Sequence, residues 1–201
     1  MNNQVLTKNL ECPEIDRKEI LRYARVGEEN EQISALLDEC ISEGLPKTSY
    51  RVCYCEFDIS ECGGKLDMGF CVTESSVLKQ YLCDCEKIIL FVATIGHDID
   101  RLILGNSVLA PSKATLLQAF GSERVEALCD AFCSEIKTEQ SEKGFITKPR
   151  VSAGYGDIPL AMQRDIFAHL DCTRKIGVTL SDSLFMRPEK SVSAIVGIKR
   201  K

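Results

Sequence analysis

Apolar residues that recur every three or four positions predict several helices along the chain. The longest covers residues 111–137, where an apolar stripe follows Pro111, a residue favoured at the first position of a helix. The same period predicts shorter helices over residues 15–26, 31–43, 75–81, 97–104 and 160–170. Such stripes indicate helices that bury one face against another layer of structure.

Other stretches have the patterns of strands. Residues 49–59 alternate between apolar and polar side chains, and residues 191–196 do the same. Residues 87–95 form the most apolar stretch, which predicts a central strand covered on both faces. After a glycine turn at residues 62–64, the run 66–72 is expected to pair antiparallel with 49–59. The predicted fold class is therefore α+β, an antiparallel or mixed twisted sheet with helices packed against it.

The length of 201 residues fits one compact domain with a substantial core. Within it, we expect an N-terminal helical segment at residues 1–48 and an α+β core at residues 49–201. No internal repeat or linker-like stretch divides the chain.

Charge and hydropathy exclude several kinds of partner. The net charge is −5, and the only basic run is Lys199-Arg200-Lys201, which argues against nucleic acid. The longest apolar run, residues 88–95, is too short to cross a bilayer, and the N-terminus lacks the pattern of an export signal. We therefore expect a soluble cytoplasmic protein that binds neither nucleic acid nor membrane.

The chain has 11 cysteines, an odd number without an export signal, which predicts reduced thiols. Two pairs have strand spacing and a third has the spacing of one helical turn: Cys53 and Cys55, Cys83 and Cys85, and Cys129 and Cys133. No Cys-x-x-Cys spacing typical of zinc or iron–sulfur sites occurs. Small buried side chains are the favoured interpretation, and a metal or redox role is the alternative.

The loop at residues 150–159 is the strongest candidate for a binding site. Gly154 and Gly156 permit backbone conformations that other residues avoid, and Pro159 fixes the exit of the loop. Arg150 offers a planar fork of donors that matches a carboxylate, and Tyr155 offers a flat apolar face. These residues favour a site for a zwitterion or a carboxylate joined to a flat ring. The alternative is a turn between helices, with Arg150 in a surface ion pair.

Catalytic machinery is not evident in the sequence. The two histidines, His97 and His169, have no second metal-type ligand at a suitable spacing. Nucleophile elbows, phosphate-binding loops and the dinucleotide-binding fingerprint are also absent from the sequence. We therefore expect neither catalytic residues nor a metal site.

An ordered series of short motifs runs through the C-terminal quarter of the chain. It comprises Arg150-x-x-x-Gly154-Tyr155, Asp157-x-Pro159, Leu170-Asp171, Lys175-x-Gly177-x-x-Leu180-x-x-Ser183, Met186-x-Pro188 and Ser191-Val192-Ser193. This series resembles the activation domain of cobalamin-dependent methionine synthase. Upstream, Phe91-x-x-Thr94-x-Gly96 and the helix at residues 114–136 also resemble that family.

The resemblance implies binding of S-adenosylmethionine, whose methyl group remethylates a cobalamin that has been oxidised to the inactive cob(II) state. By this likeness Arg150 corresponds to the residue that grips the methionine carboxylate, and Ser152 and Gly154 lend backbone groups. Tyr155 is expected to pack on the ligand. Glu126 aligns with an acid that contacts the ligand's cationic side, where the sulfonium and amine both need negative partners.

The chain lacks the Asp-x-His-x-x-Gly motif of the cobalamin-binding module that usually accompanies this domain. The resemblance therefore implies a stand-alone activation domain in methionine biosynthesis, part of a methyltransferase system without catalytic residues of its own. Its partner would be a methionine synthase that lacks this domain and supplies the cobalamin, which is a vitamin-derived cofactor. A flavodoxin-like or ferredoxin-like donor would supply the electron. The alternative is a non-catalytic docking or metabolite-sensing protein for a corrinoid methyltransferase.

Overall fold

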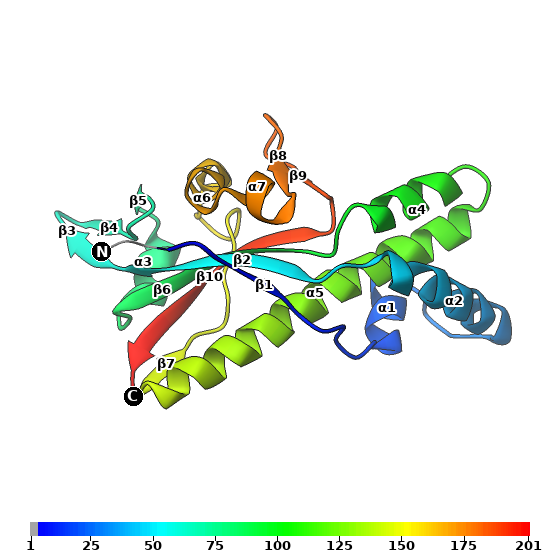
Figure 1. Cartoon of the computed structure of the whole chain (residues 1–201), viewed down its shortest axis with the longest axis horizontal. Helices are drawn as coiled ribbons and strands as arrows, with labels where there is room; N and C mark the ends of the chain where they lie inside the picture. Colours follow the sequence, from blue (N-terminus) through cyan, green and yellow to red (C-terminus); the bar gives the residue numbers. More distant parts are fainter. Residues whose placement is uncertain (1–3) are drawn as a thin grey trace.

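A five-stranded antiparallel sheet lies at the centre of the computed structural model, which describes residues 4–201 (Figure 1). Its strands, in spatial order, are β1 (Leu6–Asn9), β2 (Arg51–Asp58), β6 (Lys87–Thr94), β10 (Ser191–Arg200) and β7 (Phe145–Thr147). Every neighbouring pair is antiparallel. This confirms the predicted α+β class and the central position of the most apolar strand, β6.

Alternate residues of β6 enter two separate hydrophobic cores. Phe91 faces the core on one side of the sheet, whereas Leu90 and Val92 face the other, and all three are fully buried. Because side chains alternate along a strand, only a strand without polar interior residues can be covered on both faces. The sequence of β6 meets this condition.

Helices cover both faces of the sheet. The helices of the first core are α1 (Arg17–Tyr23), α2 (Glu31–Gly44), α4 (Asp98–Asn106) and α5 (Pro111–Glu142), with the short 3-10 helix η1 (Leu45–Lys47) after α2. The helices of the second core are α3 (Ser76–Leu82), α6 (Met162–Leu170) and α7 (Cys172–Ile176). The long helix α5 runs diagonally across its face of the sheet (Figure 1). It extends beyond the predicted end at residue 137.

The expected pairing of residues 49–59 with 66–72 is wrong. The first stretch is β2, and its partners are β1 and β6. The second lies in a separate small sheet of β3 (Ser60–Cys62), β4 (Lys65–Asp67) and β5 (Val72–Thr73). The glycine turn joins only β3 and β4, because Cys62 pairs directly with Lys65. The apolar strand β6 offers β2 two buried faces, which the short and largely exposed β3–β4 hairpin does not.

The segment before residue 49 contains a strand as well as helices. β1 pairs with β2 and forms one edge of the sheet. Ile20 of α1 and Leu37 of α2 are fully buried in the first core. A second short element that the sequence did not predict is the hairpin of β8 (Thr179–Leu180) and β9 (Met186–Arg187).

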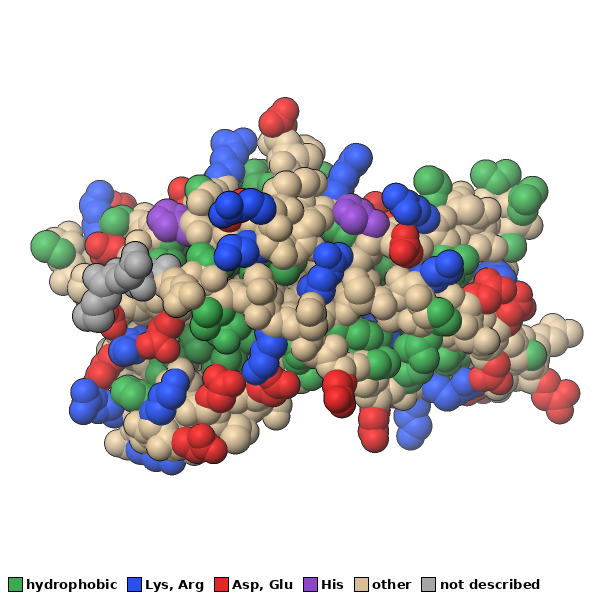
Figure 2. Space-filling model, in the orientation of Figure 1, with side chains coloured by type: hydrophobic (Ala, Val, Ile, Leu, Met, Phe, Trp, Pro, Cys, Tyr) green, Lys and Arg blue, Asp and Glu red, His purple; other side chains and the backbone are tan. Residues whose placement is uncertain are grey.

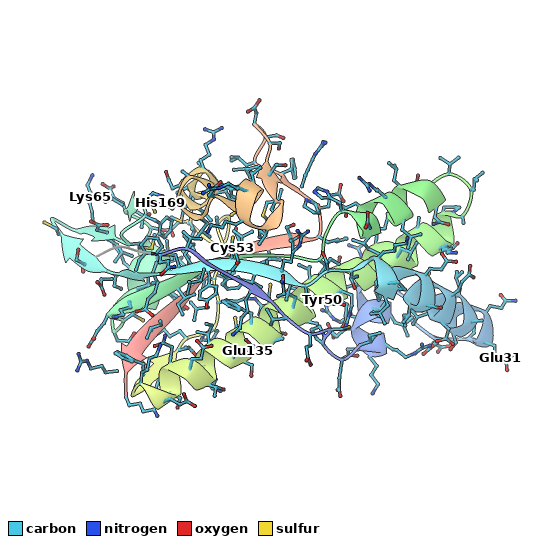
Figure 3. The ribbon with its side chains drawn as sticks, viewed as in Figure 1. Glu31, Tyr50, Cys53, Lys65, Glu135 and His169 are labelled. Atoms are coloured by element: carbon cyan, nitrogen blue, oxygen red, sulfur yellow. The ribbon has the colours of Figure 1, made fainter. Side chains whose placement is uncertain are left out.

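Two of the three predicted cysteine arrangements are confirmed. Cys53 and Cys55 both face the second core, and Cys53 is labelled in Figure 3. Cys129 and Cys133 lie one turn apart on α5. The strand spacing of Cys83 and Cys85 does not correspond to a strand, because α3 ends at Leu82 and a turn follows. Those two residues have the spacing of a strand but lack the apolar run that would form one.

The thiols differ in their surroundings, which predicts selective labelling. Cys12, Cys62 and Cys83 are exposed. Cys172 is buried with its sulfur 3.6 Å from that of Cys53, and this hydrogen bond together with burial raises the pKa of Cys172. Since the thiolate is the reactive form, a thiol reagent should label the exposed cysteines long before Cys172. Mass spectrometry of the labelled peptides measures this order, and unfolding in denaturant should abolish it. Rapid labelling of Cys172 in the native protein would contradict it.

Candidate functional site

The predicted binding loop runs along the edge of the sheet beside β10. Val151 and Ile195 exchange backbone hydrogen bonds of 3.0 and 2.8 Å in an isolated antiparallel bridge. Side chains alternate there as in a strand, so Val151 and Ala153 pack on the second core while Arg150 reaches the opposite side. The edge of the sheet therefore directs Arg150 toward α5.

Arg150 is bound by two carboxylates of α5. One terminal nitrogen, Nη2, donates to Glu126, and the other, Nη1, donates to Asp130. The exposed fractions of the three side chains are 23% for Arg150, 41% for Glu126 and 71% for Asp130. Burial lowers the pKa of Arg150, but the two carboxylates outweigh that effect and raise it above its usual value. The guanidinium therefore stays charged.

Glu126 and Asp130 lie one turn apart on α5, so both carboxylates face the loop. Asp130 belongs to the site, although its sequence position indicated only the polar face of a helix. The available signal was its spacing of four residues from Glu126.

A tight turn follows Arg150. The amide of Gly154 donates to the carbonyl of Ile158 at 3.0 Å, and the amide of Tyr155 donates to the carbonyl of Ser152 at 3.2 Å. Gly154 and Gly156 have φ angles of +89° and +58°, which glycine adopts without steric cost. Tyr155 is 66% exposed. The turn thus contains Ser152, Gly154 and Tyr155, whereas Arg150 precedes it and lies against α5.

Asp157 fixes this turn to the N-terminus of α3. Its carboxylate accepts from the amides of Ser76 at 2.7 Å and Val77 at 3.2 Å, and also from the hydroxyls of Ser75 and Ser76. The hydrogen bonds from the Ser75 and Ser76 hydroxyls contribute most, and together with the amide bonds they hold the pKa of Asp157 well below its usual range. Asp157 therefore has a structural role next to the candidate site.

We predict that Asp157→Ala destabilises the protein at neutral pH, because the start of α3 loses a capping carboxylate. A depressed native pKa means that this stabilisation is present above the unfolded pKa of about 3.9 and is lost as the pH falls through the native value. The difference in Tm between wild type and variant should therefore shrink in acid. Calorimetry at pH 7 and in acid measures it, and a difference that is the same at both pH values would contradict this role.

A groove of about 500 Å³ lies between α1 and α5, beyond the two carboxylates that hold Arg150. Its lining includes Asp16, Glu19, Glu123, Glu126 and Asp130, with Tyr23 at one wall. Asp16 also caps α1 by accepting from the amides of Lys18 and Glu19 at 2.9 and 3.1 Å. The groove suits a positively charged group.

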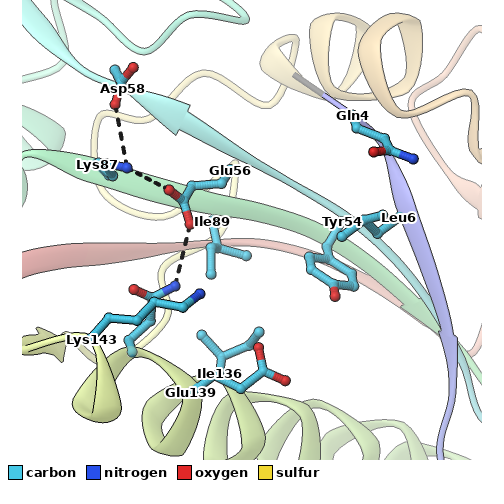
Figure 4. A pocket seen from close by; sticks show the side chains of 11 residues that line it. Gln4, Leu6, Tyr54, Glu56, Asp58, Lys87, Ile89, Ile136, Glu139 and Lys143 are labelled. Atoms are coloured by element: carbon cyan, nitrogen blue, oxygen red, sulfur yellow. Dashed lines mark hydrogen bonds and ion pairs between the residues drawn. The ribbon is translucent and has the colours of Figure 1, made fainter. Parts of the chain in front are cut away.

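Several other cavities lie outside this site, among them the following two. One, of about 310 Å³, separates the sheet from the C-terminal part of α5 (Figure 4). Its polar groups bind one another: Lys87 donates to Glu56 at 2.8 Å, and Gln140 donates to the same carboxylate at 3.3 Å. The other, of about 690 Å³, lies beside the β8–β9 hairpin and includes Leu160 and Phe185 in its lining.

Both histidines contact other residues of the fold. His97 Nε2 lies 3.2 Å from the carbonyl of Gly177. His169, labelled in Figure 3, lies edge-on to the rings of Phe57 and Phe70. Among residues 4–201, no group of three or more His, Cys, Asp or Glu side chains is arranged to hold a metal ion.

Charges of both signs are interspersed over the face in Figure 2, and exposed apolar residues gather at the tip where α4 leads into α5. The exposed apolar residues of that tip are Leu104, Val108 and Leu109. In the described part of the chain, no helix has both the length and the apolar character needed to span a bilayer.

Comparisons with known proteins identify the fold. No family model matches the chain, and no curated protein does either. Among solved structures, the crystal structure of the MetH reactivation domain bound to AdoHcy superposes with a TM-score of 0.67 at 14% sequence identity. The match covers 97% of this chain and 78% of the other. The chain therefore has the fold of that reactivation domain, as the resemblance of its motifs implied.

Proposed function

We propose that this chain is a stand-alone S-adenosylmethionine-binding activation domain, which supports reductive remethylation of cob(II)alamin on a methionine synthase acting in trans. The observation that carries the proposal is the placement of Arg150. The sheet edge presents this arginine beside two carboxylates, in a fold like that of a solved reactivation domain bound to AdoHcy.

The charges of the site fit the ligand. S-adenosylmethionine carries one carboxylate and two positive groups, an ammonium and a sulfonium, so its net charge is positive. Arg150 carries one positive charge, and Glu126 and Asp16, which line the adjoining groove, carry two negative charges. A site with this balance favours a cationic ligand that also has a carboxylate for the guanidinium.

The proposed contacts follow from the groups that the turn leaves available. Arg150 binds the carboxylate, and Glu126 faces the cationic side of the ligand. The amide of Gly154 is bonded within the turn, so its carbonyl is the backbone group it offers. Ser152 contributes its backbone, and the exposed ring of Tyr155 packs on the ligand.

The chain's own residues would bind and orient the ligand and keep water away from it. When bound, S-adenosylmethionine supplies the methyl group, and the partner's reduced cobalamin serves as the nucleophile, so no side chain of this protein needs to act as a base. The partner would be a methionine synthase without its own activation domain. A flavodoxin-like or ferredoxin-like protein would provide the electron.

A second candidate is a non-catalytic docking or metabolite-sensing protein for a corrinoid methyltransferase. One observation favours it: Leu160 and Phe185, which line one cavity near the loop, are both exposed. A partner protein could bind these residues without any methyl transfer.

A remethylation assay separates the two functions. A methionine synthase without an activation domain, in its cob(II)alamin form, is incubated with S-adenosylmethionine and reduced flavodoxin, with and without this protein. The expected result is conversion of the cob(II)alamin absorption spectrum to that of methylcobalamin only when the protein is present. Binding of S-adenosylmethionine without conversion would leave the docking or sensing function, and absence of binding would reject the proposal.

A further inference from the structure

Each terminal nitrogen of the Arg150 guanidinium donates to a protein carboxylate in the described structure. Nη2 is bound by Glu126 and Nη1 by Asp130. A ligand carboxylate is best bound through the same fork of donors. A ligand carboxylate that uses the N–H groups now bound by Glu126 and Asp130 therefore displaces at least one of these two carboxylates.

Exposure indicates which carboxylate is held less firmly. The side chain of Asp130 is 71% exposed, whereas that of Glu126 is 41% exposed. Ion pairs that solvent reaches are weak, because water and salt screen them. Asp130 has no other hydrogen-bond partner or ion pair among residues 4–201, so nothing else holds its carboxylate in place.

We propose that Asp130 occupies the position on Arg150 that the ligand's carboxylate takes, so that binding exchanges one carboxylate for another. The inference rests on the proposed function, because it takes the amino-acid end of S-adenosylmethionine as the incoming group. Arg150 remains paired with two carboxylates before and after the exchange. Asp130 thereby lowers the affinity for any ligand carboxylate that uses this position.

The exchange predicts opposite effects for two neighbouring acids. Asp130→Asn removes the competing charge and should tighten binding of S-adenosylmethionine about two- to fivefold, the range expected for an exposed ion pair. Glu126→Gln should weaken binding, because that carboxylate faces the cationic side of the ligand. Glu14→Gln is the matched control, since Glu14 lines the same acidic groove and is exposed but does not bind Arg150.

Two measurements test the exchange. Calorimetric titration with S-adenosylmethionine compares wild type with the three variants. Separately, phenylglyoxal, which modifies arginine side chains, is applied without ligand, and mass spectrometry follows the peptide that contains Arg150. We expect faster modification of Arg150 in Asp130→Asn and an unchanged rate in Glu14→Gln.

The outcomes distinguish this inference from the function on which it rests. Faster modification together with tighter binding in Asp130→Asn supports the exchange. An unchanged modification rate, or an affinity equal to or weaker than that of wild type, overturns it. Faster modification with no binding of S-adenosylmethionine by any form would uphold the exchangeable ion pair and reject the proposed function.

Discussion

Arg150→Ala is expected to weaken binding of S-adenosylmethionine by about 10- to 100-fold, as estimated for loss of a hydrogen bond between charged groups. The side chain is 23% exposed, so its bond to a ligand carboxylate would be only partly screened by solvent. Arg150→Lys keeps the positive charge but loses the fork of donors, and an intermediate affinity is expected. Calorimetric titration measures both.

The control for this substitution is Arg174→Ala. Arg174 is also an arginine in an ion pair, with Asp171, but it is largely exposed and lies on α7, which packs on the second core. Its loss should leave the affinity unchanged. The Tm of both variants should be close to that of wild type, because the carboxylates that lose their arginine partner are reached by solvent in each case. Full affinity in Arg150→Ala would remove this residue, and with it the proposed carboxylate position, from the site.

The parts of the fold that the sequence predicted are those with a strong local pattern. β6 is apolar throughout and α5 has a long apolar stripe, so both could be assigned without knowledge of their neighbours. β1 and β7 were missed because edge strands are short and only partly buried, and they show no clear alternation. The partner of β2 was misassigned because strand pairing depends on contacts distant in the sequence.

The site shows the same division between local and distant information. The composition of the loop singled out Arg150, Gly154 and Tyr155. The partners of Arg150 lie 24 and 20 residues earlier, at Glu126 and Asp130, and they meet it only because the loop crosses the edge of the sheet. The resemblance brought Glu126 into the prediction, whereas Asp130 needed the three-dimensional structure. The roles assigned to these residues stay predictions until binding is measured.

A buried ion pair supports one wall of the acidic groove. Arg124 is fully buried on α5 and is bound to the neighbouring Glu123, which is also buried. Its guanidinium also donates to the carbonyls of Pro13 and Glu14 at 2.7 and 2.5 Å, and Glu123 accepts from the amide of Asp16 at 3.1 Å. The pair therefore fastens the chain before α1 onto α5.

Arg124→Met is expected to lower the free energy of unfolding by about 3–5 kcal/mol, because it leaves the carboxylate of Glu123 buried without a counter-ion. That loss is a large fraction of the roughly 5–15 kcal/mol that stabilises a typical domain. Urea denaturation measures it. The double variant Glu123→Leu and Arg124→Met removes both charges and should recover part of the loss, although the two backbone carbonyls stay without their donor. A single variant as stable as wild type would mean that water reaches Glu123 and that the pair does not fasten this segment.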